Sequence, residues 1–268
     1  MGQLKSLRRK FRMVRDGWLG PLPRPEKWVF IVGCYNSGTT LLHDILASHP
    51  SIGSMPGEGQ FYTDELLLPK SVGLPRLWAI EAERFRMDEN SGREVNVERL
   101  KRQWGARYND PSCPVLLEKS PTNAARTRWL QRHFENARFI GIVRNGYAVA
   151  EGIHRKAGHP LDVAALQWAR SNKIMLEDFE HLERKRVLRY EDLTESPEET
   201  LKGVLAFLDL SSSEMSLTER VWEVHERKAS IRNMNDESLE KLGSREREVI
   251  ESKAGDLLRC LGYPWHPR

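Results

Sequence analysis

The chain has 268 residues, of which 39% are hydrophobic and 30% charged, and its formal net charge is +4. This length is ample for one large domain with a buried core, and the composition excludes membrane-embedded and disordered proteins. The sequence has no long apolar run and no signal-peptide core, so we expect neither a spanning helix nor secretion. Its three distant cysteines form no zinc or disulfide pattern, which favours a reducing compartment, and we expect a cytoplasmic protein.

Much of the positive charge lies in residues 1–15, which hold six Lys and Arg side chains and no acid. Without these six, 36 basic residues face 38 acidic ones, so we expect no nucleic-acid partner. Apolar residues recur at helical spacing among the cations: Leu4, Leu7, Phe11 and Val14. They predict an amphipathic helix that makes weak contact with an anionic membrane surface, or else packs on the domain or forms a disordered arm. With the Pro-rich link that follows, it forms a segment of its own over residues 1–25.

Strands and helices alternate in the predicted elements of residues 26–268, which indicates a single domain. Short apolar runs predict buried strands at 28–32, 114–117, 138–143 and 186–190. Helical spacing of apolar residues predicts helices at 39–48, 122–134, 163–182, 196–208 and 244–260, and another from Arg144 through Ala150. The predicted fold class is α/β: a P-loop-type three-layer fold with a central parallel sheet flanked by helices.

Two regions depart from this alternation. Residues 66–112 combine prolines, glycines and dense charge, and we interpret them as a mainly helical insertion over the sheet. The region after Glu214 predicts further helices, with Val221, Trp222 and Val224 on their apolar faces.

A glycine-rich loop, Gly-Cys-Tyr-Asn-Ser-Gly-Thr-Thr over residues 33–40, joins the strand at 28–32 to the helix at 39–48. Backbone N–H groups in such a loop face one concavity at a helix N-terminus, where the helix dipole favours an anion. The loop therefore predicts a phosphate site with these candidate ligands: Tyr35, Asn36, Ser37, Gly38, Thr39 and Thr40. The alternative is a tight strand–helix turn in which a threonine caps the helix.

Thr39 stands where the nucleotide-binding pattern G-x4-G-K-[ST] has its lysine. That lysine reaches the β- and γ-phosphates of a nucleoside triphosphate, so its absence disfavours ATP or GTP as the ligand. A ligand with a single 5′-terminal phosphate group is favoured instead. A small-molecule kinase on the same architecture and a catalytically silent nucleotide-binding module remain alternatives.

Residues 33–42 resemble the 5′-phosphosulfate loop of sulfotransferases that use 3′-phosphoadenosine 5′-phosphosulfate (PAPS), most of all the tyrosylprotein and carbohydrate types. The resemblance implies an enzyme with PAPS as its sulfuryl donor. No acidic Mg²⁺-binding pattern follows a predicted strand, so we expect no metal ion. Asn36 occupies the position where this family usually has a basic residue, so another group must supply that charge.

Two segments resemble those that carry the family's catalytic residues. Residues 49–60 resemble its "HP … GE" segment, which implies that Glu58 is the general base for an acceptor hydroxyl. The alternative role of Glu58 is to cap a helix near Phe61. Residues 118–121 resemble the E-K-[ST]-P segment, in which Lys119 would stabilise the transferring group and compensate for Asn36, unless it is a solvated lysine.

Residues 142–146 resemble the family's 3′-phosphate segment, which assigns Arg144 to that phosphate. Gly152 stands where the family has a serine, so a hydroxyl contact is missing there, and Arg155 or Lys156 could supply charge instead. Residues 190–198 resemble the Y-E-D-L … P-E segment, which implies that Tyr190 lies near the bound nucleotide; the alternative is a buried core tyrosine.

Together these motifs predict in-line transfer of the sulfuryl group from PAPS to a hydroxyl-bearing acceptor. The acceptor stays open among a sugar, a peptide tyrosine, a lipid and a small alcohol or phenol. Residues 66–112 would form a lid on the acceptor side. Candidate walls of the acceptor pocket are aromatic, with the core as the alternative place for such residues: Phe61, Tyr62, Trp78 and Trp104.

Overall fold

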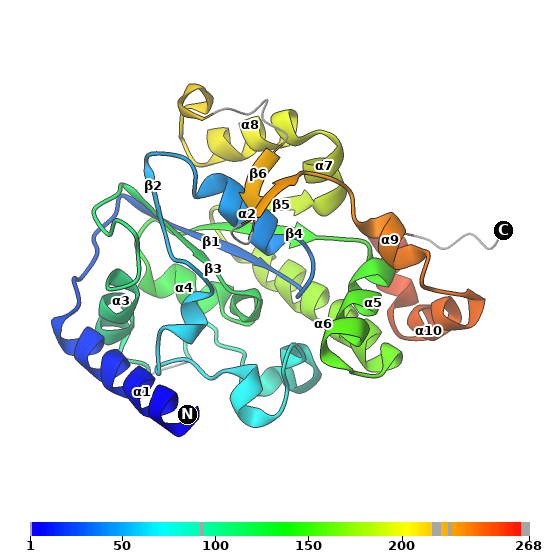
Figure 1. Ribbon diagram of the computed structural model, residues 1–268, viewed down its shortest axis with the longest axis horizontal. Coiled ribbons are helices and arrows are strands. Elements are labelled where there is room, and N and C mark those ends of the chain that lie inside the picture. Colours follow the sequence, from blue (N-terminus) through cyan, green and yellow to red (C-terminus); the bar gives the residue numbers. More distant parts are fainter. Residues whose placement is uncertain (1, 92–93, 216–220, 225–226, 264–268) are drawn as a thin grey trace.

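The computed structural model describes residues 2–91, 94–215, 221–224 and 227–263. Its centre is a parallel five-stranded sheet with the strand order β2-β3-β1-β4-β5 (Figure 1). The strands are β1 (Lys27–Gly33), β2 (Ile52–Ser54), β3 (Val115–Lys119), β4 (Arg138–Val143) and β5 (Lys185–Arg189). Four of them are the strands that the apolar runs predict, whereas β2 is too short to be recognised from sequence.

The central strand, β1, is buried along its whole length, and its alternate side chains contribute to two separate cores. On one face lie α2 (Thr39–Leu46), α7 (Tyr190–Glu195) and α8 (Pro197–Phe207). On the other lie α4 (Thr127–His133), α5 (Gly146–Ala157), α6 (Leu161–Glu180) and α10 (Ser244–Cys260). The predicted three-layer α/β fold is therefore confirmed.

The register of the sheet brings the predicted site segments to one edge. Ile31 pairs with Lys119 of β3, and Gly33 pairs with Ile142 of β4. The carboxyl ends of three neighbouring strands thus meet where the loop at 33–40, Lys119 and Arg144 begin. Open α/β sheets bind their ligands at this edge.

Two helix predictions are wrong. The predicted helix at 122–134 is broken at Arg126 into the 3-10 helix η4 (Pro121–Ala125) and α4. After η5 (Ser212–Glu214), the segment predicted as helical contains β6 (Val221–Val224), antiparallel to β7 (Arg227–Ser230), before α9 (Asn235–Leu239). A run such as Val-Trp-Glu-Val suits a strand, and over so few residues periodicity cannot separate the two structures.

The insertion at 66–112 is not mainly helical. The helical parts of its described residues are the 3-10 helices η2 (Pro69–Val72) and η3 (Trp78–Arg84) and one α-helix, α3 (Val97–Gly105), which together cover less than half of them. Proline and glycine interrupt the rest. Trp78 and Trp104 are completely buried, so they belong to the core and are not walls of an open pocket.

The N-terminal segment forms α1 (Gly2–Leu19), which packs against α3 along the outside of the molecule (Figure 1). Gln103 donates a hydrogen bond to the Met13 carbonyl, and Asp16 forms an ion pair with Arg107. The predicted helix therefore forms and packs on the domain through one of its faces, so the described part of this segment is not a disordered arm. No helix in the described part of the chain is both long and apolar enough to cross a membrane.

Candidate functional site

The loop between β1 and α2 has a strained backbone that two residues make possible. Asn36 and Gly38 have φ angles of 65° and 96°, in the left-handed region. A β-carbon on Gly38 would lie 2.5 Å from the Tyr190 ring, so only glycine fits there. The loop conformation therefore depends on these two residues, and the buried Tyr190 ring packs against it.

Two buried polar groups in this loop have no partner. The Ser37 hydroxyl and the Asn36 side-chain nitrogen are inaccessible to solvent and form no hydrogen bond with the described residues. The first N–H groups of α2, which starts at Thr39, also lack acceptors within the helix. Unpaired donors at a helix N-terminus suit a bound anion, so the loop fits a phosphate or phosphosulfate group.

Three cations converge on Asn36. Arg144 Nη1 donates to its backbone carbonyl at 2.9 Å, and Lys156 Nζ and Arg76 Nη1 donate to its side-chain oxygen at 3.1 and 3.3 Å. The motif assigns Arg144, and Lys156 as a possible addition, to the 3′-phosphate. Lys119, which is expected to compensate for Asn36, contacts Thr40 instead. Arg76 comes from the insertion, and no sequence motif indicates it. The positive charge missing at position 36 is thus present around it.

Arg144 is held in place by contacts on two sides. Its guanidinium lies 4.1 Å from the centre of the Tyr190 ring, and its Nε donates to Asn235 Oδ1 at 2.8 Å. Burial lowers the pKa of Arg144. Asn235 also donates to Glu191, at 2.7 Å, and sequence reasoning missed both of these residues as parts of the site.

The other predicted residues near the loop take different positions. Gly152 faces Asn36, and a β-carbon on it would meet Asn36 Cγ at 3.4 Å, an ordinary contact distance. Arg155 forms an ion pair of 2.7 Å with Glu151 on its own helix. Tyr35 is buried, its hydroxyl lies 3.1 Å from Thr122 Oγ1, and burial raises its pKa to about 12. Its side chain therefore packs in the core and connects the loop to η4 through Thr122.

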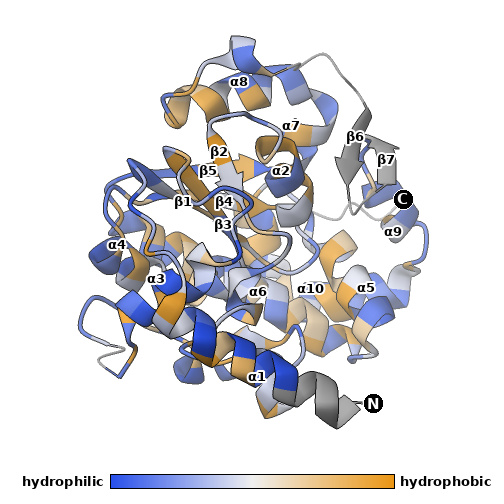
Figure 2. Ribbon diagram, turned by 60° about the vertical axis from the view of Figure 1, so that its left-hand side comes forward, coloured by the Kyte–Doolittle hydropathy of each residue, from blue (hydrophilic) through white to orange (hydrophobic). Residues whose placement is uncertain are grey.

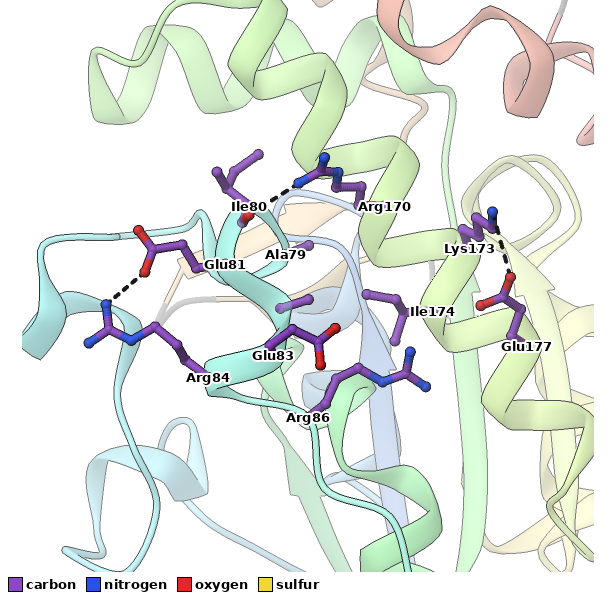
Figure 3. A pocket seen from close by; sticks show the side chains of 11 residues that line it. Ala79, Ile80, Glu81, Glu83, Arg84, Arg86, Arg170, Lys173, Ile174 and Glu177 are labelled. Carbon is purple, nitrogen blue, oxygen red and sulfur yellow. Dashed lines mark hydrogen bonds and ion pairs between the residues drawn. The ribbon is translucent and has the colours of Figure 1, made fainter. Parts of the chain in front are cut away.

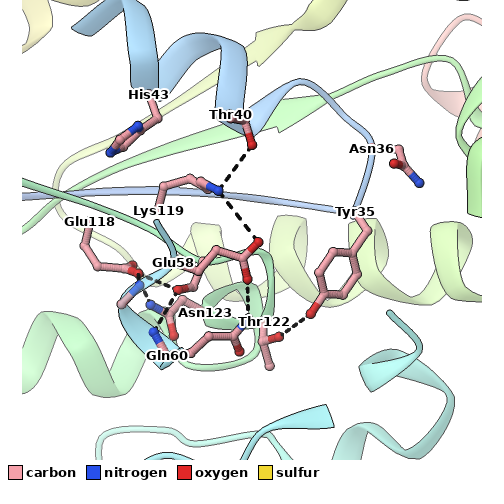
Figure 4. A network of polar contacts seen from close by, with 12 residues as sticks. Tyr35, Asn36, Thr40, His43, Glu58, Gln60, Glu118, Lys119, Thr122 and Asn123 are labelled. Atoms are coloured by element: carbon pink, nitrogen blue, oxygen red, sulfur yellow. Dashed lines mark hydrogen bonds and ion pairs between the residues drawn. The ribbon is translucent and has the colours of Figure 1, made fainter. Parts of the chain in front are cut away.

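Lys119 connects the phosphate loop to Glu58 (Figure 4). Its Nζ lies 3.2 Å from Thr40 Oγ1 and 3.6 Å from Glu58 Oε1. Glu58 precedes the 3-10 helix η1 (Gly59–Phe61), but its side chain does not cap it and instead accepts a hydrogen bond from Gln60. The structure thus brings together the two residues predicted to be catalytic, and neither the capping role of Glu58 nor the solvated lysine is observed.

The backbone beside Glu58 is fixed by two buried side chains to which the motifs assign no role. Glu118 accepts a hydrogen bond of 2.9 Å from the Gly59 N–H and further ones from Ser120 and Asn123. Trp104 Nε1 donates to the Gly59 carbonyl at 2.9 Å. Burial raises the pKa of Glu118 to about 7, although these hydrogen bonds oppose the shift.

A concavity of about 520 Å³ lies between η3 and α6 (Figure 3). Several of its charged side chains are already engaged: Arg84 pairs with Glu81, Lys173 lies 3.8 Å from Glu177, and Arg170 donates to the Ile80 carbonyl. None of the predicted site residues lines it. The edge of the sheet therefore remains the candidate site.

Residues 29–214 match the sequence profile of the sulfotransferase family. The chain belongs to the sulfotransferase family. Protein-tyrosine sulfotransferase 2 of Gallus gallus is 27% identical to this sulfotransferase over 203 residues, which cover 70% of the chain and 53% of the relative. The protein-tyrosine sulfotransferase of Drosophila melanogaster is 28% identical over 196 residues, or 68% and 38% of the two chains. The chain spans about half the length, or less, of these curated relatives.

Two solved structures share the fold of this sulfotransferase. The sulfotransferase domain from the curacin biosynthetic pathway has a TM-score of 0.53 and 23% identity, covering 91% of this chain and all of that one. A sulfotransferase from Mycobacterium tuberculosis has a TM-score of 0.59 and 14% identity, with coverage of 91% and 80%. The fold and the family predicted from the sequence are thus confirmed, whereas the roles of individual site residues stay predictions.

Proposed function

We propose that this chain transfers the sulfuryl group of PAPS to a hydroxyl group of an acceptor, with Glu58 as the general base. One observation carries this proposal: Lys119 Nζ bridges Thr40 of the phosphate loop and the Glu58 carboxylate. A cation in this position lies between the proposed phosphosulfate site and the proposed base. It can therefore stabilise the sulfuryl group as that group passes to an acceptor hydroxyl beside the base.

The donor site is built from groups that suit the two ends of PAPS. The Ser37 hydroxyl, the Asn36 amide nitrogen and the N–H groups at the start of α2 would hold the phosphosulfate end. Arg144 uses Nε and Nη1 in its bonds to Asn235 and Asn36, and a guanidinium has five N–H donors, so others are left for the 3′-phosphate. Arg76 and Lys156 add the charge that Asn36 lacks.

Bound PAPS would supply an activated sulfuryl group. Glu58 accepts the proton of the acceptor hydroxyl as the new oxygen–sulfur bond forms and the bond from sulfur to the departing phosphate oxygen breaks. Lys119 and the loop N–H groups stabilise the negative charge that builds on that phosphate. The products are a sulfate ester and adenosine 3′,5′-bisphosphate, and we propose that the step needs no metal ion.

The acceptor is defined here only as a hydroxyl group. Because the curated relatives are named protein-tyrosine sulfotransferases, tyrosine peptides are the first acceptors to test. Sugars, lipid alcohols and small phenols complete the panel. Phe61 is partly exposed three residues after Glu58, and it is the predicted pocket wall best placed to contact an acceptor.

The test combines binding and transfer. Calorimetry should detect binding of adenosine 3′,5′-bisphosphate, and mass spectrometry should detect one added SO₃ group on an acceptor after incubation with PAPS. Glu58→Gln should lower kcat about a hundredfold or more while leaving nucleotide affinity unchanged, since only the proton acceptor is lost. Glu83→Gln removes an exposed carboxylate elsewhere and serves as the matched control.

Three results would contradict the proposal. Binding of Mg-ATP without binding of the bisphosphate would favour the kinase. Nucleotide binding without transfer to any acceptor of the panel would favour the silent binding module. Full activity of Glu58→Gln would remove Glu58 as the base.

A further inference from the structure

We propose that α1 is a docking helix that binds the surface of an anionic lipid bilayer. The contact surface is the outer face of α1, defined as Phe11, Val14, Trp18 and Leu19. The inference concerns where the protein binds and holds whether or not the proposed transfer reaction is correct.

The outer face of α1 is the main exposed apolar surface of the described residues. Seven large hydrophobic side chains are exposed among the residues whose side chains are described. Four of them belong to α1: Phe11 (68% exposed), Val14 (46%), Trp18 (76%) and Leu19 (80%). The remaining three are distributed over other elements: Phe61, Leu67 and Val187. A cluster of this kind on one helix indicates a binding surface, whereas scattered apolar side chains do not.

Helix geometry places these side chains on the side of α1 that faces away from the domain. Phe11, Val14 and Trp18 are separated by three and four residues and so share one face. The opposite face is occupied: Met13 and Asp16 are buried against the domain, and α1 lies along α3. Figure 2 shows α1 on the outside of the molecule, with hydrophilic and hydrophobic residues alternating around it. The outer face therefore needs another partner to cover it.

The charges around this face favour an anionic surface. Five basic side chains of α1 are exposed: Arg8, Arg9, Lys10, Arg12 and Arg15. Asp16 is the single acid between residues 8 and 19, and it is buried and paired with Arg107. A helix with exposed Trp and Phe between cations and no exposed acid has the composition of helices that lie in the interface of an anionic bilayer. A protein partner would not require charge of one sign only.

α1 is in contact with the segment that carries the predicted base. Arg9 Nη2 donates a hydrogen bond of 2.9 Å to the carbonyl of Phe61, the last residue of η1. Phe61 is itself 42% exposed, and Glu58 precedes it by three residues. A bilayer bound along α1 would therefore lie next to the segment that carries Glu58.

The test measures binding of the full chain to sedimented vesicles of phosphatidylcholine alone or mixed with phosphatidylglycerol. We expect binding to the mixed vesicles, weakened by high salt, and at least about tenfold weaker binding to the neutral ones. Phe11→Ser with Trp18→Ser should abolish binding, with Val187→Ser as the control for an exposed apolar residue. Arg8→Glu with Arg12→Glu should also abolish it, with Arg245→Glu and Lys253→Glu on α10 as the control of equal charge.

Tryptophan fluorescence gives a second measurement. Five tryptophans are fully buried, namely Trp28, Trp78, Trp104, Trp129 and Trp168, and the side chains of Trp222 and Trp265 lie outside the described residues. We expect a blue shift on adding mixed vesicles, and its loss in Trp18→Phe would assign the shift to Trp18. Absence of vesicle binding would overturn the proposal, as would equal binding to neutral vesicles. A dimer in ultracentrifugation that Phe11→Ser with Trp18→Ser dissociates would also overturn it, since the outer face would then bind a second copy.

Discussion

The two sides of the candidate site are built in different ways. The backbone that would hold the phosphosulfate on the donor side is one contiguous segment, Gly33–Thr40, whose conformation follows from its own glycine and asparagine and from the helix that it enters. The acceptor side depends on distant contacts, because the backbone beside Glu58 is held by Glu118 of β3 and Trp104 of α3. A phosphate loop is thus a local structure, whereas the position of the base is determined by the packing of the whole sheet and its insertion.

The largest effect is expected on the donor side, from Gly38→Ala. The added methyl group would meet the Tyr190 ring at 2.5 Å, in a backbone conformation that alanine disfavours. We expect affinity for adenosine 3′,5′-bisphosphate, measured by calorimetry, to fall at least about a hundredfold. Gly73→Ala is the matched control, because its φ of 80° imposes similar strain while nothing lies within 4 Å of the new methyl group. Equal affinities of the two variants would show that the contact with Tyr190 is unimportant.

On the acceptor side, Glu118→Gln should change the pH dependence of folding. Burial raises the pKa of Glu118 from 4.5 to about 7, so the folded state binds the proton more tightly than the unfolded state does. The free energy of unfolding of the wild type should therefore fall as pH rises from 4.5 to 7, by up to about 3 kcal/mol. Urea unfolding at several pH values should show a smaller fall for Glu118→Gln. An identical slope in both proteins would mean that folding does not raise the pKa of Glu118.

The cations around Asn36 test whether donor binding depends on residues outside the loop at 33–40. Arg76→Ala and Lys156→Ala should each weaken binding of the bisphosphate about tenfold, because each removes one charge that contacts Asn36. Arg155→Ala, next in sequence to Lys156 but paired with Glu151, should change affinity little. If Arg76→Ala had no effect, the insertion would contribute nothing to donor binding.

The smallest effect is expected from Trp104→Phe, which removes the hydrogen bond to the Gly59 carbonyl. We expect kcat to fall about fivefold with unchanged nucleotide affinity, since one buried hydrogen bond contributes about 1 kcal/mol. Trp129→Phe is the matched control: Trp129 is equally buried, but its Nε1 has no hydrogen-bond partner within the described ranges. The prediction fails if both variants lose the same activity.

The contrast between a local loop and long-range packing also explains which features the sequence could predict. The alternation of apolar runs and amphipathic helices predicts the sheet and its layers, and the motif of residues 33–40 predicts the phosphate loop. Lys156 could be found because it lies one helical turn from Gly152. Arg76 could not, because its approach to Asn36 depends on the path of an insertion without regular periodicity.

The sequence could not decide between a pocket wall and the core for Trp78 and Trp104, for a related reason. An aromatic residue in a charged, irregular segment has the same sequence context in a pocket wall as in a core, and only packing decides between the two. The roles of Glu58 and Lys119 follow from a resemblance. The structure adds that the two side chains are in contact.

The pairing of β3 with β1 has a consequence for folding. Neighbouring residues of a strand point to opposite faces, so Lys119 is directed to the side of α2 while Glu118 is directed to the other core. A shift of β3 by one residue would exchange an ammonium group and a carboxylate between these two environments. Such a misfolded sheet would keep its strands and helices but bring a negative charge to the phosphate loop. Only the register in which Ile31 pairs with Lys119 brings the ammonium group to the phosphate loop. A measurement of secondary-structure content alone would not distinguish this register from the shifted one.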